Sequence, residues 1–368
     1  MNHLRLVIKL GTSTLTAGTT RLSPARMVDL VRQVSRLHSD GCEIVLVTSG
    51  AIAAGRERLS YPQLPKDIPI KQMLAAVGQP RLMALYEQLF DLYGKRVGQV
   101  LLTKADLSSR RGYLNSRNTL SALLSQSVIP VVNENDTVAT EEIRVGDNDN
   151  LSALTANLIE AEMLILLTDQ PGLFTEDPRR SPDARLIQEV RGPEIPASLW
   201  QAAGDSSAAL GTGGMITKLQ AADLARRSGA RVVIAPGGEP DIILRIAAGE
   251  TVGTCFLPVA AALESRKRYL LASGKSNRRV VIDEGAALAL RSGSSLLPVG
   301  LVQVEGDFDR GDIIAVMDES SHELARGLVN YSADDLVKIH GRHSTEIEMI
   351  LGYAYGDEVI HRNNLVLL

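Results

Sequence analysis

A glycine-rich segment that runs directly into a lysine has the clearest capacity for chemistry in this chain. It reads Gly211-Thr-Gly-Gly-Met-Ile-Thr-Lys218, and a helical pattern over residues 215–228 follows it. Glycine lacks a side chain and loses much backbone entropy on folding, so packing does not explain three glycines within four positions. Free N–H groups at a helix start favour an anion, and Lys218 adds a positive charge. The segment predicts a phosphate site; the alternative is a flexible loop before a surface helix.

A second lysine ends an apolar segment near the start of the chain. Lys9 belongs to the run of residues 4–10 and is followed by Gly11-Thr-Ser13. A lysine at the edge of a sheet often extends its amine to solvent, which is the simpler interpretation. The glycine and two hydroxyls that follow suit a phosphate tail. We therefore expect Lys9 and Lys218 to flank the phosphates of one ligand.

Two short segments are dense in carboxylates and amides. They are Asn133-Glu-Asn-Asp136 and Gly146-Asp-Asn-Asp-Asn150. A helix N-cap explains one such residue, and Asp149 or Asn150 is expected near the cap of a helix over 151–161. The excess indicates recognition of a small polar molecule with a charged amine. Residues 137–145 between the two segments read as a mobile loop over that site.

Thr168 and Asp169 follow another apolar run and precede a proline-glycine turn. A turn is the simpler interpretation, and the functional one is a wall of a nucleotide pocket. The scattered histidines and two cysteines form no cluster with the spacing of metal ligands, so no structural metal is expected.

The elements that must position these residues alternate between strand-like and helix-like segments. Nearly all-apolar strands separated by helices indicate an α/β fold with a mostly parallel sheet that is covered on both faces. In such sheets a ligand binds beyond the carboxyl ends of the strands, where the polar residues lie here. The expected strands are 4–10, 43–47, 97–102, 128–132, 163–167 and 231–235, and the expected helices are 24–39, 70–93, 116–126, 151–161 and 215–228.

The pattern changes near residue 258 of the 368. A linker over 258–275 precedes a small β-rich domain over 276–356, with strands expected at 279–282, 300–304, 312–316 and 323–328, and 357–368 reads as a tail. Residues 276–356 hold 7 basic and 13 acidic side chains, which disfavours binding of a nucleic-acid backbone. RNA binding by this domain is the alternative from another functional class.

Bulk composition points to an ordinary globular protein. The net charge is −4, and 45% of the residues are hydrophobic. This balance does not call for nucleic acid or an anionic membrane as partner. No apolar run approaches the ~20 residues of a membrane span, and the first residues lack a signal-peptide layout, so a cytoplasmic protein is expected.

Taken together and in order, these motifs resemble the amino-acid kinase family, in the branch that carries a C-terminal PUA domain. The motifs are Val7-Ile-Lys-Leu-Gly11, Thr48-Ser-Gly-Ala51, the two amide-rich segments and the glycine-rich segment. The resemblance implies an αβα sandwich kinase domain over 1–257 and a PUA-like domain over 276–356. It implies transfer of the γ-phosphoryl group of ATP, with Mg²⁺ carried by the nucleotide, to the side-chain carboxylate of L-glutamate in the first step of proline synthesis.

The resemblance also assigns roles to single residues. Glutamate would be bound by Ser49, Gly50, Asn133, Asp136 and Asn148. ATP would be bound by Lys9, Thr168, Asp169, Thr212, Gly213, Gly214, Met215, Ile216, Thr217 and Lys218. Catalysis would rest on Lys9 and Lys218, with Asp149 orienting the two lysines.

Partners and rival substrates follow from the same resemblance. It implies feedback inhibition by proline, a homo-oligomer and functional coupling to glutamyl phosphate reductase, the next enzyme. Because the acceptor carboxylate has a pKa of about 4.3, no general base is expected. Acetylglutamate, aspartate and uridylate kinases share the fold and stay open as alternatives, although the amide-rich segments suit a free amine better than an acetylated one.

Overall fold

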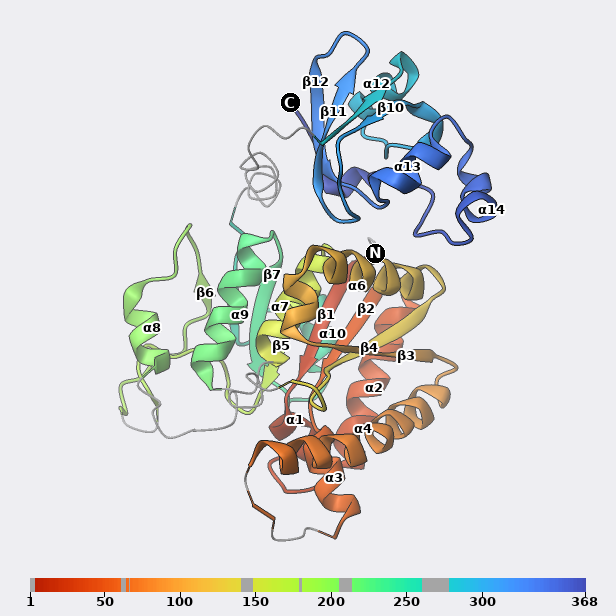
Figure 1. The fold of residues 1–368 in the computed structure, drawn as a ribbon. Coiled ribbons are helices and arrows are strands. Elements are labelled where there is room, and N and C mark those ends of the chain that lie inside the picture. The colour runs from red at the N-terminus through yellow and green to blue at the C-terminus, as the bar shows by residue number, and fades with distance from the viewer. Residues whose placement is uncertain are drawn as a thin grey trace. The chain divides into compact units, whose positions relative to one another are not determined.

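The architecture is taken from a computed structural model, which describes residues 4–60, 64–65, 67–139, 148–178, 181–204, 214–259 and 278–368 (Figure 1). Contacts within the chain define two compact units. The N-terminal unit comprises residues 1–107 and 119–262, and the C-terminal unit comprises residues 108–118 and 263–368.

An eight-stranded sheet forms the centre of the N-terminal unit in the described ranges. Its order is β3-β4-β2-β1-β5-β7-β8-β6, and its neighbours pair in parallel except β7 with β8. The mostly parallel sheet that the sequence predicts is confirmed. The strands are β1 (Arg5–Leu10), β2 (Glu43–Thr48), β3 (Arg96–Leu102), β4 (Val128–Glu134), β5 (Met163–Thr168), β6 (Glu189–Val190), β7 (Arg231–Pro236) and β8 (Thr254–Phe256).

The five strands that end in small or polar residues are consecutive in this sheet. They are β4, β2, β1, β5 and β7, and each runs parallel to its neighbours. Parallel strands bring their carboxyl ends to the same edge of a sheet. The polar residues after these strands therefore lie along one edge, with the end of β1 at the centre.

Helices cover both faces of the sheet, as an αβα sandwich requires (Figure 1). In β1, Leu6, Ile8 and Leu10 join a core cluster with residues of α2, α4 and α10. Successive side chains of a strand alternate between faces, so Lys9 points to the other side, where α7 contacts β1 and α9 contacts α7. The helices of this region are α1 (Thr12–Thr16), α2 (Pro24–Ser39), α3 (Ala51–Arg58), α4 (Ile68–Asp91), α5 (Lys104–Ser108), α6 (Arg110–Ser125), α7 (Asn148–Leu158), α8 (Ala197–Gly204), α9 (Met215–Arg227) and α10 (Ile242–Ala247).

The helix α7 differs from its prediction in a way that matters for the site. The sequence places its first residue at 151, but the helix begins at Asn148. Asp149 therefore lies inside the first turn rather than before it, and its negative charge is favourable near the positive end of the helix. Short polar residues resemble a turn in the sequence, whereas here they form the first turn of a helix.

The C-terminal unit is built on a five-stranded sheet of order β10-β9-β11-β12-β13. Its strands are β9 (Arg279–Ile282), β10 (Leu301–Glu305), β11 (Ile313–Asp318), β12 (Glu323–Leu328) and β13 (Leu365–Leu367), and its helices include α12 (Glu284–Arg291), α13 (Ala333–Ile339) and α14 (Ile347–Leu351). The segment 357–368, which reads as a tail, contributes β13 through antiparallel pairing with β12. Residues 108–118, from the end of α5 to the middle of α6, also belong here, and Asn118 donates to the backbone carbonyl of Tyr355 at 3.0 Å.

Across the described parts of both units, no helix combines the length and apolarity needed to cross a membrane.

Candidate active site

Three charged side chains from distant parts of the chain meet inside the N-terminal unit. Lys9 Nζ lies 2.6 Å from Asp149 Oδ1, and Lys218 Nζ lies 3.3 Å from Asp149 Oδ2. Asp149 is fully buried, and the lysines are 5% and 6% exposed. Burial opposes the ionisation of Asp149, but the charges of Lys9 and Lys218 and the hydroxyl of Thr217 outweigh it and lower its pKa to about 2. The ionised carboxylate holds together two amines that would otherwise repel each other.

The sequence places these three groups by simple rules of local structure. Alternation directs both Arg5 and Lys9 of β1 to the face of α7 and α9, and Lys9 is the one that lies near the carboxyl end of the strand. Asp149 lies in the first turn of α7, and Lys218 lies in the first turn of α9. Burial is the largest cause that lowers the pKa of the Lys218 amine, and the nearby charge of Lys9 acts in the same direction. The simple interpretation of Lys9 as a solvent-directed lysine is therefore wrong.

The start of α9 is open. Its N-cap is Gly214, which has an extended backbone with a φ of −79° and supplies no side-chain cap. A Cβ atom at this position would meet no atom of the described residues within 4 Å. Thr217 Oγ1 lies 2.8 Å from the Gly214 carbonyl and 2.7 Å from Asp149 Oδ2, so it ties the helix start to the charged cluster. Met215 and Ile216 occupy the same first turn, while Thr212 and Gly213 lie outside the described residues.

Thr168 and Asp169 follow at the end of β5, the strand next to β1. Thr168 is buried, and its hydroxyl donates to Asp169 Oδ1 at 3.0 Å. The charge of Asp169 also raises the pKa of Lys218, although less than Asp149 does. Both residues therefore belong to the surroundings of the lysine cluster.

A second cluster consists of amides and one hydroxyl rather than charges. Asn148 Nδ2 donates to Ser49 Oγ at 3.0 Å and to Asn133 Oδ1 at 3.2 Å. Ser49 follows β2 and precedes Gly50, whose φ of +102° favours glycine and turns the chain into α3. Asn133 lies near the end of β4 and is 1% exposed. The structure thus brings three of the predicted glutamate residues into one hydrogen-bonded group.

Gln79 of α4 completes this group, and no sequence motif predicts it. Asn133 Nδ2 donates to Gln79 Oε1 at 2.8 Å, and Gln79 is buried. A single glutamine inside a long helix belongs to no motif. The one unusual feature of this position in the sequence is the proline that follows it, because a residue before a proline is disfavoured in a helix.

Asp136 stands apart from both clusters. Within the described ranges its carboxylate makes no hydrogen bond or ion pair, and burial raises its pKa to about 6. A desolvated carboxylate without a partner is an acceptor for a cation that the ligand would bring. The structure therefore does not join Asp136 to Ser49 or Asn148 by a direct bond.

Comparison with known proteins identifies the fold family. The model of the amino acid kinase family matches residues 4–236, and the model of the PUA domain matches residues 278–351. The chain belongs to the amino acid kinase family. It is 56% identical to a protein named Glutamate 5-kinase from Photobacterium profundum, over 99% of this chain and 96% of that protein. It is also 54% identical to a Glutamate 5-kinase from Shewanella amazonensis, over 100% of this chain and 96% of that protein. The resemblance that the motifs predict is confirmed.

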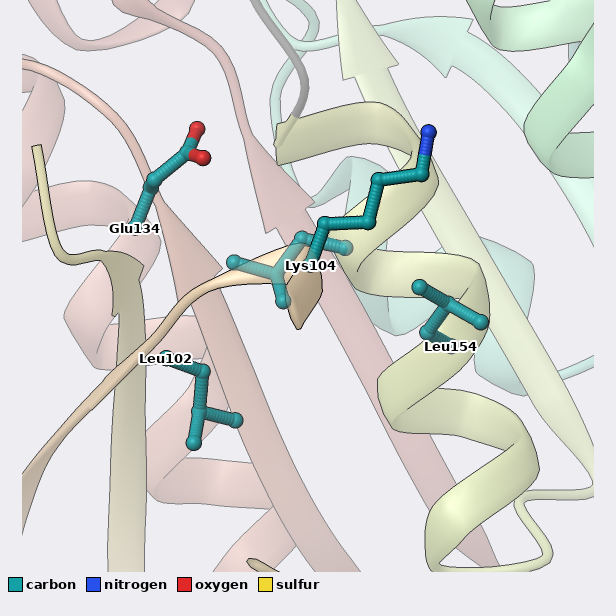
Figure 2. A pocket seen from close by; sticks show the side chains of 5 residues that line it. Leu102, Lys104, Glu134 and Leu154 are labelled. Atoms are coloured by element: carbon teal, nitrogen blue, oxygen red, sulfur yellow. The ribbon is translucent and has the colours of Figure 1, made fainter. Parts of the chain in front are cut away.

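A small pocket of this amino acid kinase is lined by residues at the ends of β3 and β4 and by residues of α5 and α7 (Figure 2). It encloses about 220 Å³ including its open mouth. Leucines form its apolar wall, and the ends of Lys104 and Glu134 lie above them. None of the residues with a predicted role lines it; the lining residues are Leu102, Lys104, Glu134, Leu151 and Leu154.

In the described ranges, no group of three or more His, Cys, Asp or Glu side chains is placed to hold an ion. Mg²⁺ characteristically binds through substrate phosphates and only one or two carboxylates, so a three-residue cluster is not what an ATP-carried ion requires.

Proposed function

We propose that this chain transfers the γ-phosphoryl group of ATP to the side-chain carboxylate of L-glutamate, giving L-glutamyl 5-phosphate for proline synthesis. The observation that carries the proposal is the buried cluster of Lys9, Asp149 and Lys218 in a chain of this family. The names of relatives at 53–56% identity over nearly the full chain support the choice of substrate.

Charge governs the reaction at the phosphate end. A glutamate side chain is ionised at neutral pH, so its activation requires no general base. The obstacle is the approach of one anion to another, which positioning and charge neutralisation can overcome. Lys9 and Lys218 supply two positive charges in a water-poor site, where electrostatic stabilisation is strong. Asp149 forms ion pairs with both amines and fixes their positions, and it does not need to take up a proton.

The residues present fit an ATP phosphate tail. The start of α9, which has no side-chain cap from Gly214, offers backbone N–H groups beside Lys218, and no atom of the described residues lies within 4 Å of a Cβ at Gly214. The nucleotide supplies the γ-phosphoryl group, with Mg²⁺ bound to its phosphate oxygens. We assign its contacts to Lys9, Thr168 and Asp169 and to residues 212–218.

Glutamate is assigned to the amide end of the same sheet edge. Ser49, Gly50, Asn133 and Asn148 provide hydrogen-bonding groups, and Asp136 provides a carboxylate for the substrate ammonium. An opposite charge lowers the pKa of a carboxylate, so the ammonium of bound glutamate would lower the pKa that burial raises to about 6.

A substrate panel tests this assignment. The full chain is incubated with ATP and, in turn, with glutamate, acetylglutamate, aspartate or UMP, and acyl phosphates are trapped with hydroxylamine. Glutamate should give the highest kcat/KM. A higher value for acetylglutamate, aspartate or UMP would overturn the proposal in favour of that substrate.

Inhibition by proline belongs to the same proposal. We assign its binding to a region that overlaps the glutamate site, and residues 140–145 of the predicted covering loop lie outside the described range. Proline should then raise the KM for glutamate without lowering kcat. Inhibition that excess glutamate does not relieve would place proline elsewhere. A homo-oligomer and coupling to glutamyl phosphate reductase remain expectations from the family resemblance.

A further inference from the structure

One face of α4 contacts the polar edge of the sheet at three places. Gln72, Gln79 and Tyr86 are spaced seven residues apart, which places them on the same side of a helix. Gln72 Nε2 donates to the backbone carbonyl of Ala139 at 3.2 Å, and the hydroxyl of Tyr86 lies 2.8 Å from that of Thr48. Gln79 lies between these contacts. This face of α4 therefore supports the region to which glutamate is assigned.

The hydrogen bonds from Gln79 have a direction. Gln79 Oε1 accepts from Asn133 Nδ2, so Asn133 must present Oδ1 on its other side. That oxygen accepts from Asn148 Nδ2, which also donates to Ser49. Asn148 Oδ1 is consequently turned away from this amide relay, and it is buried with no hydrogen-bond partner in the described part of the chain. A buried acceptor without a partner is costly unless a ligand supplies a donor.

Backbone contact fixes the position of Gln79. Its neighbour Gly78 packs directly on α3, where an added Cβ would lie 1.8 Å from the carbonyl oxygen of Ala51. Gly55 of α3 makes the reciprocal contact, since a Cβ there would lie 1.9 Å from the carbonyl oxygen of Leu74. Two helices that touch through glycine backbones have little freedom to shift. The crossing therefore holds Gln79 close to the turn at Ser49.

The position of Gln79 in α4 is unfavourable for a helix because a proline follows it. Gln79 precedes Pro80 inside α4, and proline removes a helical hydrogen bond and crowds the preceding turn. A local rule that is broken in a well-packed region is often associated with a functional site.

We propose that Gln79 is a positioning residue for recognition of the substrate amine. It fixes the orientation of Asn133 and, through it, of Asn148, whose Oδ1 accepts a hydrogen bond from the ammonium of the bound amino acid. The inference rests on the proposed function. Gln79 itself contacts Asn133 through the side-chain amides of both residues.

Steady-state kinetics of the full chain test the inference. Gln79→Met keeps the side-chain length but removes the acceptor, and it should raise the KM for glutamate about tenfold. The kcat and the KM for ATP should stay within about twofold, because the lysine cluster is untouched. Gln79→Glu retains an oxygen that can accept from Asn133, so its effect on the glutamate KM should be smaller.

A double-mutant cycle distinguishes positioning from general damage. If Gln79 acts through Asn148, Gln79→Met should change the glutamate KM less than about twofold in the Asn148→Ala background. Gln88→Met, an exposed glutamine on the same helix, is the matched control and should leave both KM values unchanged. An unchanged glutamate KM in Gln79→Met, equal rises of both KM values, or additive effects in the cycle would overturn the inference.

The wild-type chain separates this inference from the proposed function. If it gives no acyl phosphate with glutamate, the proposed function fails. The same cycle, measured with the panel substrate that wild type does phosphorylate, then tests Gln79 independently.

Discussion

The two ends of the sheet edge shift the pKa of a buried aspartate in opposite directions. At the lysine end, Asp149 has two cationic partners and its pKa falls to about 2. At the amide end, Asp136 has no such partner in the described structure and its pKa rises to about 6. Burial acts in the same direction on both carboxylates, so the difference comes from the neighbours alone.

This contrast separates a preassembled part of the site from an incomplete one. At the lysine end the carboxylate of Asp149 is paired before any ligand arrives, so the geometry of this end is set by the fold. The amide end leaves a carboxylate and the buried oxygen of Asn148 without partners in the described ranges. Such groups stabilise a complex when a ligand supplies what they lack, and they cost stability until then.

The largest expected effect is the loss of charge balance at the lysine end. Asp149→Asn leaves two buried amines without their carboxylate, and the free energy of unfolding at pH 7 should fall by about 3–5 kcal/mol. A lowered pKa contributes stability above the ordinary pKa of a carboxyl group and loses it as pH falls through about 2. Denaturant unfolding should therefore show that the difference in the free energy of unfolding between wild type and variant becomes smaller as the pH is lowered.

The control for this change is Asp40→Asn, which removes a partly exposed ion pair with Arg36 on the surface of α2. It should cost less than about 1 kcal/mol. Equal losses for the two variants would mean that the buried cluster is not held together by Asp149.

Lys218→Ala should have the next largest effect, and it acts on rate. Removing one charge that stabilises the transferring group should lower kcat on the order of 10²-fold or more. The KM for glutamate should change little, because the amide end is intact. Arg227→Ala, an exposed cation on the same helix, is the matched control. A kcat equal to that of wild type would remove Lys218 from the chemistry.

Sequence patterns predict the lysine end better than the amide end. Apolar strands and glycine turns identify the sheet edge, and alternation within β1 then determines which face Lys9 takes. Lysine and aspartate are informative because burying either of them requires a partner. This is why residues more than 200 positions apart, Lys9 and Lys218, could be expected to converge.

The amide end depends on tertiary contacts that leave little trace in a pattern. Gln79 is placed by the glycine contact between α3 and α4, and neither that crossing nor the start of α7 at Asn148 follows from local propensity. The C-terminal unit shows the same limit. Residues 108–118 and β13 belong to it through contacts between segments that are distant in the chain.

The pH dependence of glutamate binding is expected to be a smaller effect than the two above, and it tests the difference between Asp136 and Asp149 directly. Protonation of Asp136 removes its attraction for an ammonium, so the KM for glutamate should rise as pH falls below about 6, with kcat unchanged. Asp136→Ala should raise this KM about tenfold at pH 8 and abolish its pH dependence, while the KM for ATP stays within about twofold. Initial rates from pH 5 to 8 measure both. A fall of kcat with the same pKa would instead identify a general base.

The smallest expected effect is a gain in stability, opposite in sign to the loss expected for Asp149→Asn. A raised pKa means that stability present below the ordinary pKa is lost as pH rises through about 6, so ionised Asp136 weakens the ligand-free protein. Asp136→Asn should therefore stabilise it at pH 8, on the order of 1 kcal/mol because the side chain is partly exposed. Thermal midpoints without ligand should show this gain at pH 8 and a smaller one at pH 5, and saturating glutamate should raise the midpoint of wild type more than that of the variant. A variant less stable than wild type at pH 8 would show that Asp136 already has a structural partner. The same change from aspartate to asparagine then destabilises one end and stabilises the other, because only one of the two carboxylates is neutralised by the fold itself.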